Sequence, residues 1–188
     1  MRVTGGCLRG RLIRVPGGGG VRPTQDRVRA ALFSILGGRV AEGRFLDLFA
    51  GSGAVGIEAW SRGARRVCWM ESDRRVVPVL RENVENLCGG GSVIPLDAVR
   101  NLKKGLAGEQ FDIIFADPPY GKKGGQDWLP PLLDALADGT ILAPGGLFII
   151  EQRVGAPLCA HEGWRLVGER VYGDTLLRML ERSDYGHE

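Results

Sequence analysis

The sequence of 188 residues lacks any apolar run that could cross a bilayer. Stretches such as Leu147–Ile150 are far shorter than the roughly 20 residues that a membrane-spanning helix needs. Arg2 is not followed by the apolar segment of a secretory signal. These absences exclude a membrane-spanning helix, and they predict a soluble, cytoplasmic protein that does not bind a membrane.

Cysteine is also scarce. The four cysteines are Cys7, Cys68, Cys88 and Cys159, and no two of them have C-x-x-C spacing. This scatter argues against a disulfide scaffold and against a zinc site, so we expect no metal. The remaining composition is ordinary for a globular protein, with 44% hydrophobic and 25% charged residues. A chain of this length fits one domain with a small appendage.

Lysine is missing from the first 40 residues, which are nevertheless strongly basic. This segment holds eight arginines and one acid, Asp26, which gives a net charge of +7, whereas the remaining 148 residues sum to −4. A planar guanidinium group suits contacts with phosphates and bases. The asymmetry predicts a basic arm that binds nucleic acid or, as the simpler alternative, a solvated arginine-rich surface.

The pattern of apolar residues divides the chain into two parts. Residues 1–43 are expected to form a basic extension: a β-hairpin, the Gly17–Gly20 loop, and a helix that Thr24 caps and Gly37 ends. Residues 44–188 alternate between strands and helices and form the catalytic domain. We expect strands over 45–49, 66–71, 93–96, 111–116 and 147–151, helices over 54–61, 74–87, 98–106 and 128–137, and hairpin strands over 164–172 and 175–181. This order is typical of an α/β, Rossmann-like fold, with a mostly parallel sheet and a terminal antiparallel hairpin.

Three strand ends carry residues suited to a cofactor. Open α/β sheets bind ligands beyond the carboxyl ends of their strands, where glycines let a ligand approach the backbone. Such ends occur at residues 47–53 (DLFAGSG), at Glu71 and at Asp97. Asp97 would accept a hydrogen bond from an adenine amine, unless it only caps a helix. The candidate cofactor contacts are Asp47, Ala50, Gly51, Gly53, Glu71, Ser72, Asp97, Ala98 and Asp117.

Two cofactor classes fit this edge of the sheet. Gly51, Gly53 and Gly56 satisfy G-x-G-x-x-G. Glu71 lies 20 positions beyond Gly51, as in the dinucleotide-binding fingerprint of oxidoreductases. The position of Asp47 favours S-adenosylmethionine instead, because a carboxylate there would pair with a cationic α-amino group but repel a pyrophosphate.

The most specific segment is Asp117-Pro118-Pro119-Tyr120, which follows an apolar strand. An exocyclic amine of a nucleic-acid base is a weak nucleophile, because its lone pair is delocalised into the ring. The Asp117 carboxylate and the Pro118 carbonyl would accept its two N–H bonds, and Tyr120 would stack on the flipped-out base. The prolines would hold these acceptors rigid. The four residues are therefore the candidate catalytic loop of an amino-methyltransferase that works mainly by proximity and orientation.

With these motifs the chain resembles the RsmD family of 16S ribosomal RNA methyltransferases, which modify the N2 amine of one guanine. The matching segments are residues 2–11 (with RVTGG and RGR), 22–29 (RPTQDRVR), 47–56 (DLFAGSGAVG) and 117–120 (DPPY). The resemblance implies a Rossmann-like methyltransferase domain with a small β-rich N-terminal extension. It also implies RNA contacts by Arg9, Arg11, Arg22, Thr24 and Arg27. The chain departs from the family at Asp97, where members often have asparagine.

The function implied by the resemblance is S-adenosylmethionine-dependent methylation of guanine N2 in 16S ribosomal RNA. The expected partner is ribosomal RNA in an assembling small subunit, and the expected oligomeric state is a monomer. Three alternatives stay open on the residues alone. A DNA adenine-N6 or cytosine-N4 methyltransferase would use the same tetrad, although the chain has little room for a target-recognition domain. A dinucleotide-dependent oxidoreductase would leave the tetrad and the arginine-rich arm unexplained, and a non-catalytic RNA-binding module would not need the cofactor residues.

Overall fold

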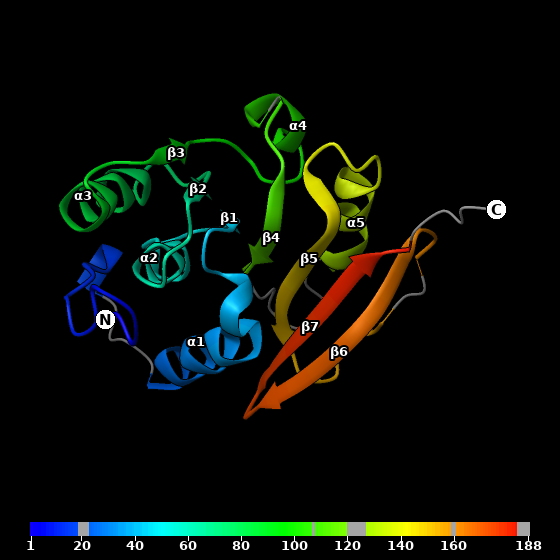
Figure 1. Cartoon of the computed structure of the whole chain (residues 1–188), viewed down its shortest axis with the longest axis horizontal. Helices are drawn as coiled ribbons and strands as arrows, with labels where there is room; N and C mark the ends of the chain where they lie inside the picture. Colours follow the sequence, from blue (N-terminus) through cyan, green and yellow to red (C-terminus); the bar gives the residue numbers. More distant parts are fainter. Residues whose placement is uncertain (19–22, 107, 120–126, 159–160, 184–188) are drawn as a thin grey trace.

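Seven strands of the described chain form one sheet in the order β3-β2-β1-β4-β5-β7-β6 (Figure 1). The computed structural model describes residues 1–18, 23–106, 108–119, 127–158 and 161–183, so the end of the predicted Gly17–Gly20 loop lies outside it. The strands are β1 (Arg44–Leu48), β2 (Arg66–Met70), β3 (Ser92–Ile94), β4 (Phe111–Ala116), β5 (Leu142–Arg153), β6 (Trp164–Tyr172) and β7 (Thr175–Arg182). The helices are α1 (Pro23–Leu36), α2 (Ala54–Ser61), α3 (Val77–Cys88), α4 (Leu102–Gly105) and α5 (Leu129–Leu136), with short 3-10 turns at Pro16–Gly18 and Gly37–Arg39.

The predicted Rossmann-like architecture is confirmed. Strands β3, β2, β1, β4 and β5 are parallel, and β7 and β6 extend the sheet as an antiparallel hairpin. Two predicted boundaries were wrong by four residues or more. β5 begins at Leu142 rather than at residue 147, because Leu142 pairs with Phe111 ahead of a bulge. α4 is a single turn, because residues 98–101 form turns and bends beside Asp97 instead of helix.

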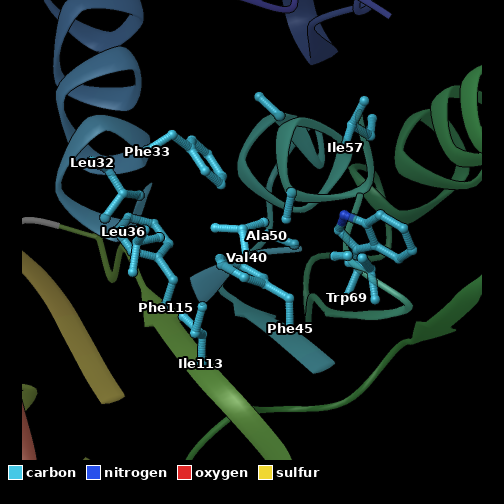
Figure 2. Close-up of a cluster of buried hydrophobic side chains, with 14 of the residues drawn as sticks. Leu32, Phe33, Leu36, Val40, Phe45, Ala50, Ile57, Trp69, Ile113 and Phe115 are labelled. Carbon is cyan, nitrogen blue, oxygen red and sulfur yellow. The ribbon is translucent and has the colours of Figure 1, made fainter. Parts of the chain in front are cut away.

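Two buried layers enclose the sheet. Helices α1, α2 and α3 cover one face, where Phe33 and Phe45 stack with ring centroids 6.1 Å apart (Figure 2). Helices α4 and α5 cover the other face, where Leu132 packs with Phe148. Phe115 belongs to the first layer. Every second residue along β4, counted from Phe115, therefore points to that same face of the sheet. No helix in the described part of the chain is long and apolar enough to span a membrane.

The N-terminal extension is less regular than predicted. The predicted β-hairpin is reduced to a short antiparallel pairing, with one bridge between Arg2 and Leu12 in the described residues before α1. The turn between them bonds to the end of α2, where Ser61 accepts the N–H groups of residues 7 and 8. Gly6 has a φ of 76° and sits so close to α2 that a Cβ would lie 1.9 Å from the Ser61 oxygen. Residues 1–3 therefore pair with residues 10–13, as in the bond of 3.0 Å from the Val3 N–H to the Arg11 carbonyl, whereas α2 satisfies the backbone of the turn between them.

The extension nevertheless packs against α2 and α3 and shares their apolar layer. Val3 and Ile13 are each 2% exposed and belong to the same apolar layer as α1. Glu58, buried in α2, accepts hydrogen bonds from the Thr4 N–H at 2.8 Å and from the Thr4 hydroxyl at 2.5 Å. The division of the chain into residues 1–43 and 44–188 stays a prediction, since both parts share one core.

Candidate active site

A cavity of about 340 Å³ lies at the carboxyl ends of the central strands. The strand order reverses between β1 and β4, and in open α/β sheets ligands bind at this switch point. The walls of the cavity include residues 49–52 of the loop after β1 and the three carboxylates of Asp47, Asp117 and Glu151. The site therefore joins the predicted cofactor loop to the first residue of the predicted catalytic loop.

Four carboxylates follow one another along this edge of the sheet. They are Glu71 after β2, Asp47 in β1, Asp117 after β4 and Glu151 in β5. The residues two positions before them are Trp69, Phe45, Phe115 and Ile149, which all belong to the layer beneath α1, α2 and α3. Because strand side chains alternate between faces, the four acids project to that same face. They provide a row of negative charge suited to a cationic ligand.

The glycine loop is held in place by Asp47. Its Oδ2 atom accepts a hydrogen bond of 2.8 Å from the Gly56 N–H in the first turn of α2. Gly53 precedes this helix with a φ of 83°, and a Cβ there would lie 2.5 Å from the side chain of Leu80. The G-x-G-x-x-G pattern thus reflects a left-handed turn and close packing at the start of α2.

Asp47 is buried, with 2% of its surface exposed. Burial raises the pKa of its carboxyl to about 8, the Gly56 N–H lowers this pKa, and the charge of Glu71 raises it. A nearby cation would favour the ionised carboxylate. A cationic amino group bound in the cavity would therefore lower the pKa of Asp47 and ionise its carboxyl.

We expect Asp47→Asn to weaken the binding of S-adenosylmethionine by about 10- to 100-fold, because a hydrogen bond to a charged group contributes roughly 1.5–3 kcal/mol. The amide can still accept the Gly56 N–H, so the fold should persist. Since the pKa of Asp47 is raised to about 8, wild-type affinity should increase between about pH 6 and pH 8, as less free energy is needed to ionise the carboxyl. Calorimetric titrations across this range would test it. Equal affinity and an equal pH profile in the variant would exclude the role.

Glu71 and Asp97 both bond to the backbone. Glu71 accepts the Gly51 N–H at 2.9 Å and the Asp73 N–H at 2.8 Å, which links the end of β2 to the glycine loop. Oδ1 of Asp97 accepts the N–H groups two and three residues ahead, at 3.0 and 2.8 Å. Asp97 therefore caps a turn rather than the helix that the simpler alternative expected, and its contact with adenine stays a prediction. The predicted cofactor residues outside the described cavity lining are Gly53, Glu71, Ser72, Asp97 and Ala98.

The catalytic loop begins in the cavity. Burial raises the pKa of the Asp117 carboxyl well above its usual range, and the charges of Glu151 and Asp47 raise it further. Pro118 is buried and Pro119 is exposed, while Tyr120 lies outside the described residues. Asp117 is therefore a carboxyl that resists ionisation until a hydrogen-bond donor or a cation joins it.

Sequence reasoning did not single out three aromatic or acidic residues of this site. Phe49 has a φ of 58°, which is uncommon for a residue with a side chain, and its ring lies edge-on to Trp128 with centroids 5.3 Å apart. The Trp128 indole N–H donates to the Pro119 carbonyl at 3.2 Å and so steadies the catalytic loop. Glu151 could have been suspected, because it ends an apolar strand. No sequence pattern marked the backbone of Phe49 or the Trp128 contact.

The N-terminal segment closes one side of the cavity with Val15 and Pro16. Asn83 of α3, which is 4% exposed, holds this segment in place. Its Oδ1 accepts the Arg14 N–H at 3.0 Å, and its Nδ2 donates to the carbonyls of Arg14 and Ser52 at 2.8 and 2.9 Å. A single side chain thus connects the extension to the glycine loop.

Arg9, Arg11 and Arg27 are not among the described residues that line the cavity. Arg9, Arg11 and Arg27 have exposed side chains. Thr24 lies in the first turn of α1, and Arg22 falls outside the described residues. These positions remain predicted RNA contacts.

Known proteins share this arrangement over almost the whole chain. The family model described as "Conserved hypothetical protein 95" matches residues 1–181. The Escherichia coli K12 protein named ribosomal RNA small subunit methyltransferase D is 36% identical over 189 residues, covering 99% of this chain and 92% of the relative. This chain belongs to the methyltransferase D family. The Haemophilus influenzae protein of the same name is 33% identical over 184 residues, covering 96% of this chain and 93% of the relative.

Solved structures agree with membership in the methyltransferase D family. The putative methyltransferase yhhF from Escherichia coli has a TM-score of 0.83 and 36% identity, covering 97% of this chain and 98% of that one. A hypothetical protein from Thermus thermophilus, TTHA0928, has a TM-score of 0.76 and 36% identity, with coverage of 95% and 98%. The sequence resemblance is confirmed. Membership favours methyl transfer over the oxidoreductase that the glycine pattern left open and over a non-catalytic binding module.

Proposed function

We propose that the protein transfers a methyl group from S-adenosylmethionine to the exocyclic N2 amine of a guanine in 16S ribosomal RNA. The observation that carries this proposal is the shared cavity of Asp117 and the loop around Gly51. A methyl donor on the loop and an amine held by Asp117 would meet there. The names of the full-length relatives support ribosomal RNA as the substrate class, and the resemblance of the motifs supports guanine N2.

The residues present fit S-adenosylmethionine. Asp47 would bind the α-amino group, the N–H groups after Gly51 would face the methionine carboxylate, and Glu71 would accept the ribose hydroxyls. Asp97 and Ala98 would contact the adenine. The bound cofactor supplies an electrophilic methyl group, so this chain has only to bind it, orient it and exclude water.

The catalytic loop would hold the amine in line with that methyl group. The Asp117 carboxylate and the Pro118 carbonyl would accept the two N–H bonds, and the Trp128–Pro119 hydrogen bond would keep the loop rigid. Tyr120 would stack on the flipped-out base. The amine becomes acidic only as it gains the methyl group, and a carboxylate whose protonated form is favoured is suited to accept the released proton.

Ribosomal RNA would lie across the basic extension. A groove there is lined by Arg2, Arg11 and Arg14, among other residues, and these guanidinium groups would contact phosphates. Arg14 also pairs with Glu82 at 2.5 Å. The substrate in the cell would be an assembling small subunit in the cytoplasm, bound by a monomer.

Neutralising the extension should reduce the salt dependence of RNA binding. We expect Arg9→Gln with Arg11→Gln to weaken binding and to lower the slope of log affinity against log salt by about one per lost phosphate contact. Arg153→Gln with Arg170→Gln is a matched control, because both side chains are exposed, on β5 and β6, and these strands lie on the side of the sheet away from the N-terminal extension (Figure 1). Filter binding over a salt series would measure both slopes. An unchanged slope, or an equal change in the control variant, would mean that the arginines of the extension are only a solvated surface and do not contact RNA.

The proposed activity is tested with a labelled methyl donor. We expect transfer to 16S ribosomal RNA or to assembling small subunits, and none to DNA. Calorimetry should show S-adenosylmethionine or its demethylated product binding with a dissociation constant on the order of micromolar. Binding of NAD without binding of S-adenosylmethionine would overturn the methyltransferase assignment, and transfer to DNA alone would overturn the RNA substrate.

A further inference from the structure

Glu151 lines the cavity, but the proposed cofactor contacts and the proposed methyl transfer do not involve its carboxylate. Strands β4 and β5 are parallel, and Ala116 pairs with Ile150. Asp117 and Glu151 are the next residues on the two strands, which lie roughly 4.8 Å apart. Both line the cavity, and the charge of Glu151 helps to raise the pKa of Asp117, after burial itself. The two carboxyl groups therefore face the same space.

The backbone that carries Glu151 is firmly held. The next residue, Gln152, is 6% exposed and accepts a hydrogen bond of 2.8 Å from Arg178 of β7. Arg178 also donates to the carbonyls of Ala156 and Pro157, at 2.7 and 2.8 Å, in the segment that follows β5. Glu151 thus projects into the cavity from a strand end fixed on its outer side.

The row of acids has two halves. Glu71 follows β2 and Asp47 lies in β1, beside the glycine loop that would bind the cofactor. Asp117 follows β4 and Glu151 lies in β5, on the other side of the switch point. A base whose amine contacts Asp117 would therefore also lie close to the Glu151 carboxylate.

We propose that Glu151 selects guanine by accepting the N1–H of the target base while Asp117 holds the adjacent N2 amine. This inference rests on the proposed function and adds a specificity-determining residue to it.

The donor pattern of the bases explains the choice. Guanine presents N1–H and N2–H donors side by side, and a pair of carboxylates accepts both. Adenine and cytosine also carry an exocyclic amine, but the ring nitrogen beside it that pairs with a partner base is an unprotonated acceptor. A carboxylate would face that lone pair without a hydrogen bond, which disfavours both bases. A second carboxylate beside Asp117 therefore distinguishes guanine from the two bases that the tetrad alone would accept.

The test replaces the target guanine of the RNA substrate by 2-aminopurine, which keeps the N2 amine and lacks the N1 proton. The wild type should methylate the guanine substrate faster than the 2-aminopurine substrate. In Glu151→Gln the amide can donate to the bare N1, so the ratio of the guanine rate to the 2-aminopurine rate should fall by about 10- to 100-fold, as expected for one base-edge contact. In Glu151→Ala the ratio should fall as well, because the repulsion is removed. Glu85→Gln, on the exposed surface of α3, is the matched control and should keep the wild-type ratio.

The outcomes separate the two proposals. Loss of rate on both substrates with an unchanged ratio in Glu151→Gln and Glu151→Ala would mean that Glu151 is only structural, and would overturn this inference. Failure of the wild type to methylate guanine at all would overturn the proposed function instead. Circular dichroism and cofactor binding would verify that each variant is folded.

Discussion

Asp117→Ala should lower kcat by about 100- to 1,000-fold while S-adenosylmethionine still binds. The magnitude is that for loss of one preorganised group that stabilises transition-state charge. Asp117 belongs to the wall of the cavity beside Glu151, whereas the glycine loop is held by Asp47 and Glu71. Single-turnover transfer assays and calorimetry on the same preparation would separate the two effects. Full activity of the variant would remove Asp117 from the mechanism.

Asp117→Asn provides the control, because it keeps the size of the side chain and removes the charge. Burial, then Glu151 and Asp47, raises the pKa of Asp117, so the wild-type rate should rise with pH until the carboxyl ionises. The residual rate of the amide should lack this rise. The folded state also binds a proton that the unfolded chain releases above about pH 4, so wild-type stability falls as pH rises through the raised pKa. The amide should therefore be more stable than the wild type at alkaline pH.

Glu58→Ala should cause the largest loss of stability. Glu58 is fully buried and accepts hydrogen bonds from Thr4, Arg29 and Arg62. Arg29 is itself 4% exposed, so the variant would leave this buried cation with Asp26 and without its fully buried partner. Breaking such a pair costs about 3–5 kcal/mol. The melting temperature should then fall by roughly 10 °C, and the extension should become accessible to protease.

The pH dependence distinguishes the charge of Glu58 from its packing. Burial raises the pKa of Glu58, but the hydrogen bonds from Thr4 and Arg62 and the charge of Arg29 outweigh burial and leave the pKa lowered. Its stabilisation is therefore present above the unfolded pKa of about 4 and is lost as the pH falls through the folded value. Glu58→Gln should thus differ most from the wild type near neutral pH, and Glu85→Gln should not differ. If Glu58→Gln lowers the free energy of unfolding by the same amount at all pH values, packing alone would explain the stabilisation by Glu58.

Apolar runs and strand-end residues were enough to predict the sheet. A short apolar run located β4 to the residue, and the glycines located the loop between β1 and α2. The residues that tertiary contacts define could not be found in this way. Trp128 belongs to no recognised motif, yet its indole N–H donates to the Pro119 carbonyl. Asn83 likewise contacts a segment that is distant in sequence.

The extension and the end of β3 show why local patterns failed elsewhere. Residues 1–16 alternate well enough for a hairpin, but only residues 1–3 and 10–13 pair, because the turn between them contacts α2 at Gly6. Asp97 has the position of an adenine contact, yet its Oδ1 caps a turn. A contact with α2 in the first case, and a side chain that bonds to its own turn in the second, satisfy backbone groups that the sequence left unassigned.

The most direct test of the proposed function is the identity of the methylated nucleoside. The protein is incubated with labelled S-adenosylmethionine and small-subunit ribosomal RNA or assembling particles, the RNA is digested, and the labelled nucleoside is analysed by chromatography and mass spectrometry. We expect a single product, N2-methylguanosine, which Asp117→Ala does not form. Label in N6-methyladenosine or N4-methylcytidine, or label in DNA only, would contradict the proposed function.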